Sequence, residues 1–133
     1  MTASIHSVIA GIRSVLERNP NVRLAMLFGS LATGKDRPDS DVDVAILADR
    51  PLSAELKAEW IGALSAATGR PVDLVDLRTA GEPLLGQVLK GRRLVGDAAL
   101  HGEWIARHLV EQADFLPYRR RILMERRRAW IGC

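Results

Sequence analysis

Short, continuous apolar runs give this chain its framework. The run Leu24–Phe28 ends at a glycine, and its length and content predict a buried strand. Residues 41–47 alternate acidic and β-branched positions before becoming wholly apolar, which predicts a second strand. A third strand is predicted over 71–77 and a short edge strand over 92–95. These segments predict a small sheet.

Apolar residues at helical spacing fill the intervals between these strands. The predicted helices cover residues 3–18, 52–67 and 83–90, and Gly69 and Gly91 end the second and the third. From about residue 98 onward the helical spacing returns, and Pro117 interrupts it, which predicts a kinked helix or two helices that meet there. The order of elements indicates an α/β (α+β) sandwich, in which helices cover a small mixed sheet.

Size and composition narrow the class of protein. The chain has 133 residues and is 47% hydrophobic, which is enough for one core and predicts a single domain over 1–133. No stretch approaches the ~18 apolar residues of a membrane span and no leader pattern opens the chain, so we expect a cytoplasmic protein with no membrane contact. The one cysteine, Cys133, excludes an internal disulfide and a cysteine-based zinc site.

Charge is distributed unevenly. The net charge is +3, but residues 117–133 carry six arginines against one glutamate, whereas the rest of the chain has 13 basic and 15 acidic residues. Such a cluster suits nucleic acid, the phosphates of a nucleotide or an acidic protein surface, and a solvated helix face explains it equally well. Nucleic acid ranks low, because only Tyr118 and Trp130 could stack on bases in this stretch.

Carboxylates supply the candidate chemistry. Asp41 and Asp43 share one face of a predicted strand, where they would repel each other unless a cation such as Mg²⁺ lay between them. Three carboxylates commonly hold the two metal ions of nucleotidyl transfer. Asp73 and Asp76 are the candidates for the third, and they face opposite sides of their strand. We choose Asp73, because an acid near a strand end more often caps a turn, although alternation alone does not decide.

The loop before these acids suits phosphate. Gly29 lets a triphosphate approach the backbone, and Ser30 offers a hydroxyl and begins a short turn whose amide groups could meet anionic oxygens. Ser40, just before the acids, is a second candidate donor. Lys35 and Arg37 are nearby cations. A tight turn would explain the Gly-Ser pair by itself, but not the spaced acids that follow it.

Together these residues resemble a known family. The pattern Gly29-Ser30, ten residues, Asp41-x-Asp43, followed by 72–77, resembles the polymerase-β-like nucleotidyltransferase superfamily and its minimal (MNT) branch over residues 5–116. The resemblance implies a palm-like nucleotidyltransferase fold with a catalytic core at 1–96 and a C-terminal helical segment at 97–133. It also implies that the Gly-Ser loop grips the β and γ phosphates, that the strand aspartates bind two Mg²⁺ ions, and that Asp73 completes the metal site and activates the acceptor hydroxyl.

One position departs from the pattern. Many relatives carry an arginine where this chain has Thr33, and Lys35 is a candidate substitute.

The resemblance also implies a function. MNT proteins are antitoxins paired with HEPN ribonuclease toxins, and they transfer AMP from ATP to a toxin tyrosine. Once the nucleotide-binding core is built, too few residues remain for an acceptor-binding domain, so we expect the acceptor to arrive on another protein. Two alternatives stay open: a vestigial antitoxin that acts by binding alone, and an enzyme that modifies a small molecule of the aminoglycoside type. The sequence does not give the oligomeric state, and both a homo-oligomer and a hetero-oligomer are possible.

Overall fold

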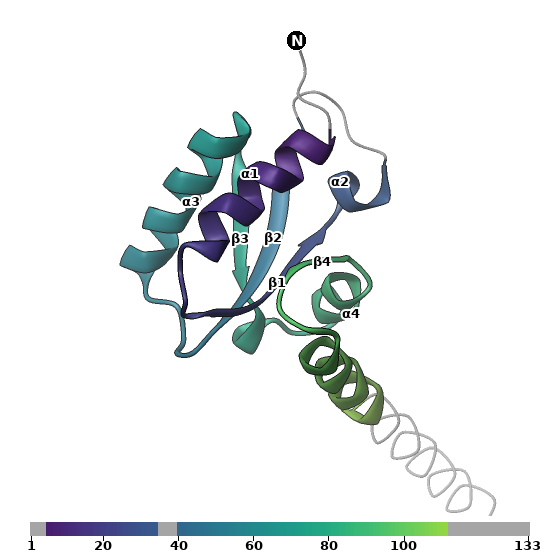
Figure 1. Ribbon diagram of the computed structural model, residues 1–133. Coiled ribbons are helices and arrows are strands. Elements are labelled where there is room, and N and C mark those ends of the chain that lie inside the picture. Colours follow the sequence, from purple (N-terminus) through teal and green to yellow (C-terminus); the bar gives the residue numbers. More distant parts are fainter. Residues whose placement is uncertain (1–4, 35–39, 112–133) are drawn as a thin grey trace, which may run out of the picture. The chain divides into compact units, whose positions relative to one another are not determined.

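A four-stranded mixed sheet forms the centre of the fold. The computed structural model describes residues 5–34 and 40–111. The strands are β1 (Val22–Phe28), β2 (Val42–Ala48), β3 (Val72–Asp76) and β4 (Arg92–Val95), in the order β3-β2-β1-β4. Strand β1 runs antiparallel to β2 and β4, and β2 runs parallel to β3. The predicted small mixed sheet is confirmed (Figure 1).

Two long helices cover one face of the sheet. Helix α1 (Ile5–Glu17) and helix α3 (Ala54–Thr68) pack side by side there (Figure 1). Apolar positions of α1 at helical spacing are buried against strand residues that include Leu27, Val44 and Leu74. The Ser53 hydroxyl caps α3 by accepting from the Leu56 amide at 3.1 Å. The helix spacing in the sequence therefore reports a real buried face.

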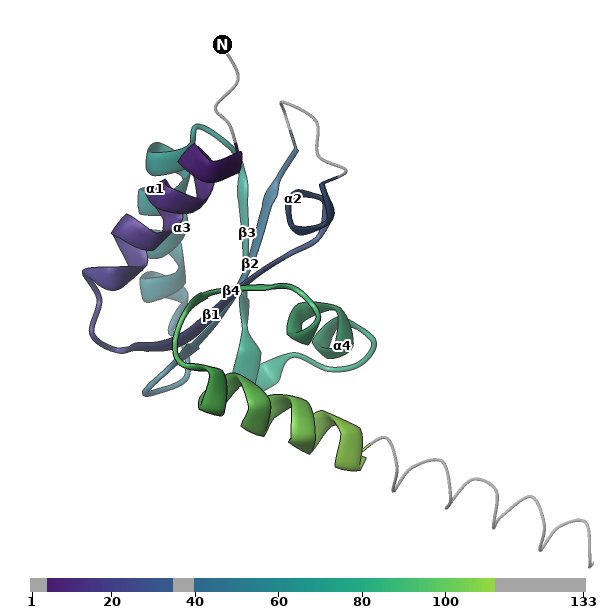
Figure 2. The same cartoon turned by 45° about the vertical axis from the view of Figure 1, so that its right-hand side comes forward.

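The opposite face is covered differently. Helix α4 (Leu84–Leu89) packs against β1 on the side away from α1 and α3 (Figure 2). Its buried Leu85, Val88 and Leu89 and the strand residues Met26 and Phe28 form the second apolar layer. Asp43 and Asp73, the second residues of β2 and β3, are cross-strand partners, and Phe28 is the partner of Asp43 on β1, so both acids lie on this face.

Short turns of helix follow two of the strands. Helix α2 (Ser30–Thr33) comes directly after Gly29, where the sequence predicted a turn. The 3₁₀ helix η1 (Leu77–Thr79) ends β3 one residue before the predicted limit, because Asp76 caps it. Strand β2 starts at Val42, so Asp41 precedes the strand instead of lying within it.

The chain divides into two compact units, residues 1–101 and 102–133. Residues 98–111 are helical. In the second unit, the Arg107 guanidinium lies over the Trp104 ring at 5.3 Å, and Ile105, Leu109 and Val110 are exposed. The predicted interruption at Pro117 and the arginine cluster lie outside the described residues, and the assignment of 1–133 to one domain stays a prediction. Within the described ranges, no helix is both long and apolar enough to span a bilayer.

Candidate active site

Neighbouring strands bring the predicted acids to one edge of the sheet. Asp43 of β2 pairs with Asp73 of the parallel strand β3, so their side chains leave the same face. Phe28, the last residue of β1, pairs with Asp43 on the other side. Asp41 lies two residues before Asp43, just outside the strand. The fold therefore gathers residues 30 positions apart in the sequence.

The third acid can be chosen from its surroundings. The Asp76 carboxylate accepts hydrogen bonds from the amides of Leu52 and Arg78, each at 3.0 Å. It is 7% exposed and belongs to the turn that ends β3, whereas Asp73 is exposed at the start of that strand. Asp76 is thus engaged in structure, which leaves Asp73 as the acid placed beside Asp43.

The acids form an electrostatically uncompensated group. Burial raises the pKa of the Asp43 carboxyl above its ordinary value, and the neighbouring charges of Asp73 and then Asp41 raise it further. Among the residues that the structure describes, no hydrogen bond or ion pair engages these three side chains. A bound cation would offset the repulsion between these three carboxylates.

Gly29 fits against this group. It has a φ of +76°, and a Cβ built on it would overlap the Asp43 carboxylate and lie 3.1 Å from its Cγ. No L-residue fits here without moving that acid. The glycine of the Gly-Ser pair therefore lets the backbone of the turn touch the acid.

The turn after Gly29 closes on itself. The amides of Ala32 and Thr33 donate to the Gly29 carbonyl at 3.2 and 3.3 Å, and the Thr33 hydroxyl donates to the Ser30 carbonyl at 3.2 Å. These groups are committed within the turn. The Ser30 hydroxyl, half-buried at the start of α2, stays the candidate phosphate donor. Lys35, the predicted substitute cation, lies outside the described residues.

Arg70, a buried arginine that the sequence analysis did not single out, contacts the segment just before Asp41. The Ser40 carbonyl accepts a hydrogen bond from Nη1 of Arg70 at 3.2 Å. Arg70 is only 7% exposed and lies between α3 and β3. Arginine side chains are rarely buried unless they are paired. The local sequence, with Arg70 between Gly69 and Pro71, does not indicate that its partner is Ser40.

The donor chemistry of this edge suits Mg²⁺, which prefers carboxylate oxygens. Within residues 5–34 and 40–111, no group of three or more His, Cys, Asp or Glu side chains is already arranged to hold a metal ion. The predicted cage is therefore not preformed. Like charges repel one another when no cation lies between them, and the side chains of Asp41 and Asp73 are exposed and can rotate toward an ion. Oxygen donors and excess negative charge together fit a divalent cation.

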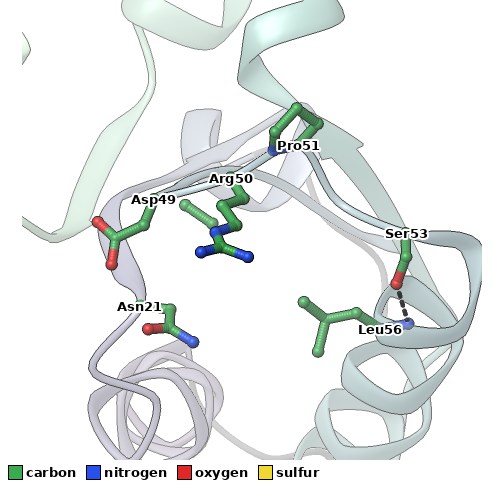
Figure 3. A pocket seen from close by; sticks show the side chains of 7 residues that line it. Asn21, Asp49, Arg50, Pro51, Ser53 and Leu56 are labelled. Carbon is green, nitrogen blue, oxygen red and sulfur yellow. Dashed lines mark hydrogen bonds between the residues drawn. The ribbon is translucent and has the colours of Figure 1, made fainter.

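A pocket of about 480 Å³ lies at the end of β2 that is remote from the acids (Figure 3). Its lining includes Asn21, Asp49, Arg50, Ser53 and Leu56, and none of the predicted site residues. The Arg50 side chain points toward its middle (Figure 3). Ser53 already caps α3 there, so part of its polar lining serves local structure.

Comparisons with known proteins converge on one family. The family described as polymerase beta, nucleotidyltransferase matches residues 11–98. The chain is 37% identical over 86 residues to the protein adenylyltransferase MntA of Shewanella oneidensis, covering 64% of this chain and 62% of that protein. The match thus spans less than two thirds of that relative.

Solved structures give the same picture. A chain in the crystal structure of a toxin-antitoxin with AMP-PNP has a TM-score of 0.74 and 29% identity, covering 88% of this chain and 96% of that one. A chain from the complex of tri-AMPylated Shewanella oneidensis HEPN toxin with MNT antitoxin has a TM-score of 0.71 and 27% identity, covering 92% and 98%. The similarity extends over nearly the whole length of both structures.

Proposed function

The chain belongs to the polymerase beta nucleotidyltransferase family, and from that premise we propose that it is a Mg²⁺-dependent protein adenylyltransferase. It is the antitoxin of a HEPN toxin and transfers AMP from ATP to a tyrosine of that toxin. The relative named protein adenylyltransferase MntA and the two similar toxin-antitoxin structures support this assignment. The reaction takes place in the cytoplasm, where ATP is available.

One observation carries the proposal from fold to chemistry. Asp43 and Asp73 are paired across β2 and β3, Gly29 touches Asp43, and the pKa of Asp43 is raised by burial and by the charges of Asp73 and Asp41. A merely structural cluster would be neutralised by partners, as Asp76 is. An intact, uncompensated cluster favours catalysis over an antitoxin that acts by binding alone.

Each residue has a proposed role. Asp41, Asp43 and Asp73 hold two Mg²⁺ ions. When bound, these ions offset the negative charge that develops on the phosphates. Gly29 and Ser30 receive the β and γ phosphates, and Ser40 is a further candidate donor near the nucleotide.

The transfer is balanced as a substitution at phosphorus. The tyrosine oxygen forms a bond to the α-phosphorus, the bond from that phosphorus to the bridging oxygen of the β-phosphate breaks, and pyrophosphate leaves. Asp73 accepts the proton of the attacking hydroxyl. The acids and the turn mainly position charge, which is the principal requirement of phosphoryl chemistry.

A labelling experiment tests the proposal. The protein is incubated with Mg²⁺, ATP labelled at the α-phosphate and the product of the adjacent reading frame, which we expect to be a HEPN protein. Label should appear on a tyrosine of that protein, and the Asp41→Asn variant should not transfer it. Absence of label with the wild-type protein, while Asp41→Asn still protects cells from the toxin, would establish binding alone. Label on a small molecule without any partner would replace the proposed acceptor.

A further inference from the structure

We infer that Arg70 is a positioning residue for the acidic edge and that it fixes the backbone before Asp41 without touching nucleotide. The inference rests on the proposed function, because it concerns metal binding by Asp41, Asp43 and Asp73. It is carried by the position and the hydrogen bonds of Arg70.

The Arg70 side chain joins two segments that are distant in the sequence. Its Nη1 donates to the carbonyl of Ser40, which immediately precedes Asp41, at 3.2 Å. Asp41 lies outside β2, so the strand ladder does not hold it directly. The nearest backbone hydrogen bond between these segments, from the Val42 amide to the Pro71 carbonyl at 2.8 Å, lies two residues after Ser40 and one residue after Arg70. Arg70 therefore extends the attachment of the two segments up to Asp41.

The backbone of Arg70 is itself held firmly. Its amide donates to the Thr68 hydroxyl at 3.3 Å, and that hydroxyl donates to the Leu64 carbonyl at 2.8 Å. Gly69 closes helix α3 with a φ of 68° and donates to the Ser65 carbonyl. The position just beyond a helix C-terminus also favours a positive charge. The guanidinium thus projects from a rigid base.

The burial of Arg70 indicates that its side chain is held in a defined position. Arg70 is 7% exposed, and a buried guanidinium is tolerated only when its charge and donors are satisfied. It connects the start of β3, which bears Asp73, with the segment that bears Asp41. Removal of a residue that orients metal ligands without binding the metal typically lowers metal affinity or activity about 10- to 100-fold.

A control arginine lies at the opposite end of β2. There the Arg78 guanidinium donates from Nη2 to the carbonyls of Ala48 and Asp49, at 2.7 and 3.2 Å. It forms the same kind of contact at the same sequence separation of 30 residues, but away from the acids. Arg78 is exposed whereas Arg70 is buried, so a purely structural role predicts a larger loss of stability for Arg70 and no specific loss of metal binding by either folded variant. A positioning role predicts that only the Arg70 variant loses metal binding while it is still folded.

The test measures binding of Mn²⁺, as a spectroscopic substitute for Mg²⁺, by the full chain in the presence of AMP-PNP. We expect Arg70→Met to weaken Mn²⁺ binding about 10- to 100-fold and Arg78→Met to leave it unchanged. We also expect excess Mg²⁺ to restore transfer by Arg70→Met, and Arg70→Lys to show a smaller loss because it keeps the charge and a donor. Thermal unfolding of both methionine variants reports any general loss of stability.

The outcomes separate the two proposals. Unchanged Mn²⁺ binding by a folded Arg70→Met, or equal weakening in Arg78→Met, overturns the inference and leaves the proposed function standing. If Arg70→Met does not fold, the uncharged and shorter Arg70→Gln takes its place, and wild-type Mn²⁺ affinity in the folded Arg70→Gln overturns the inference. Failure of the wild-type protein to bind Mn²⁺ with AMP-PNP counts against the proposed function itself.

Discussion

The two ends of strand β2 treat negative charge in opposite ways. At the acid end, formed by Asp41, Asp43 and Asp73, no hydrogen bond or ion pair engages the carboxylates within the described ranges 5–34 and 40–111. At the capped end, formed by Asp49 and Asp76, each acid has a partner. Asp76 accepts two amide hydrogen bonds, and Asp49 lies 3.9 Å from the Arg23 guanidinium.

This difference indicates which carboxylates serve the fold and which serve a ligand. A carboxylate with donors around it stabilises its own turn, whereas carboxylates gathered without donors destabilise the protein until a cation arrives. The raised pKa of Asp43, caused by burial and by its two acidic neighbours, is the physical sign of that cost.

The largest expected effect separates two aspartates of β3. Asp73→Asn should lower AMP transfer by more than about 10²-fold, the upper range for residues that only orient metal ligands, and leave folding intact. Asp76→Asn should instead cost about 1–3 kcal/mol of stability, because it weakens the buried hydrogen bonds to Leu52 and Arg78. Rates of labelled AMP transfer and urea unfolding check the pair. Equal loss of activity in both folded variants would contradict the distinction.

A second prediction compares two glycines of the turn. Gly29 and Gly34 have similar φ values of +76° and +74° but different ψ values. Gly34, with a ψ of 12°, is left-handed helical, and an alanine there costs about 1–2 kcal/mol. Gly29, with a ψ of −156°, lies in a region essentially restricted to glycine, so Gly29→Ala is the more strained variant. Only the Cβ at Gly29 would meet Asp43, since no atom of the described residues lies within 4 Å of the one at Gly34. We expect Gly29→Ala alone to impair nucleotide and metal binding, as measured by titration with AMP-PNP and Mn²⁺. Similar binding by the two variants would show that the contact with Asp43 is unimportant.

A third prediction uses the pKa of Asp43. Because burial and its acidic neighbours raise that pKa above 3.8, the folded state favours the protonated acid, and stability falls as pH rises through the folded-state pKa. At pH 7 without metal, Asp43→Asn should therefore unfold at a higher temperature than the wild type. The gain should shrink at lower pH and on addition of Mg²⁺. A lower melting temperature for Asp43→Asn in chelator would contradict an uncompensated charge.

The smallest effect is expected at the exposed pair of the capped end. Asp49→Asn should change stability by about 0–1 kcal/mol, because its ion pair with Arg23 is long and solvated. AMP transfer should not change. Chemical denaturation of Asp49→Asn and of the wild type, each with and without about 0.5 M salt, measures the difference in stability, because salt screens an exposed ion pair. A loss of AMP transfer in Asp49→Asn would contradict the assignment of the active site to the acid end alone.

Local sequence predicted much of this comparison. The apolar run that ends at Gly29 and the alternation after Asp41 predicted two strands, and the tendency of an acid at a strand end to cap a turn favoured Asp73 over Asp76. The structure places Asp76 in that capping role. These features follow from neighbours along the chain, which is why one sequence suffices to find them.

Other features depend on distant contacts. Nothing near Arg70 in the sequence announces its bond to Ser40, 30 residues away. Likewise, the turn after Gly29 becomes helix α2 because the Gly29 carbonyl accepts from amides three and four residues later, in a stretch of only four residues without a helical pattern. The roles proposed for Ser30, Ser40 and Lys35 stay predictions.

Anomalous scattering from crystals grown with AMP-PNP and Mn²⁺ would show directly whether the three acids bind the metal ions. We expect manganese at about 2.0–2.3 Å from carboxylate oxygens of Asp41, Asp43 and Asp73, with the triphosphate beside Gly29 and Ser30. Manganese and nucleotide bound elsewhere, for example in the pocket lined by Asn21 and Arg50, with the three acids still apart, would contradict it.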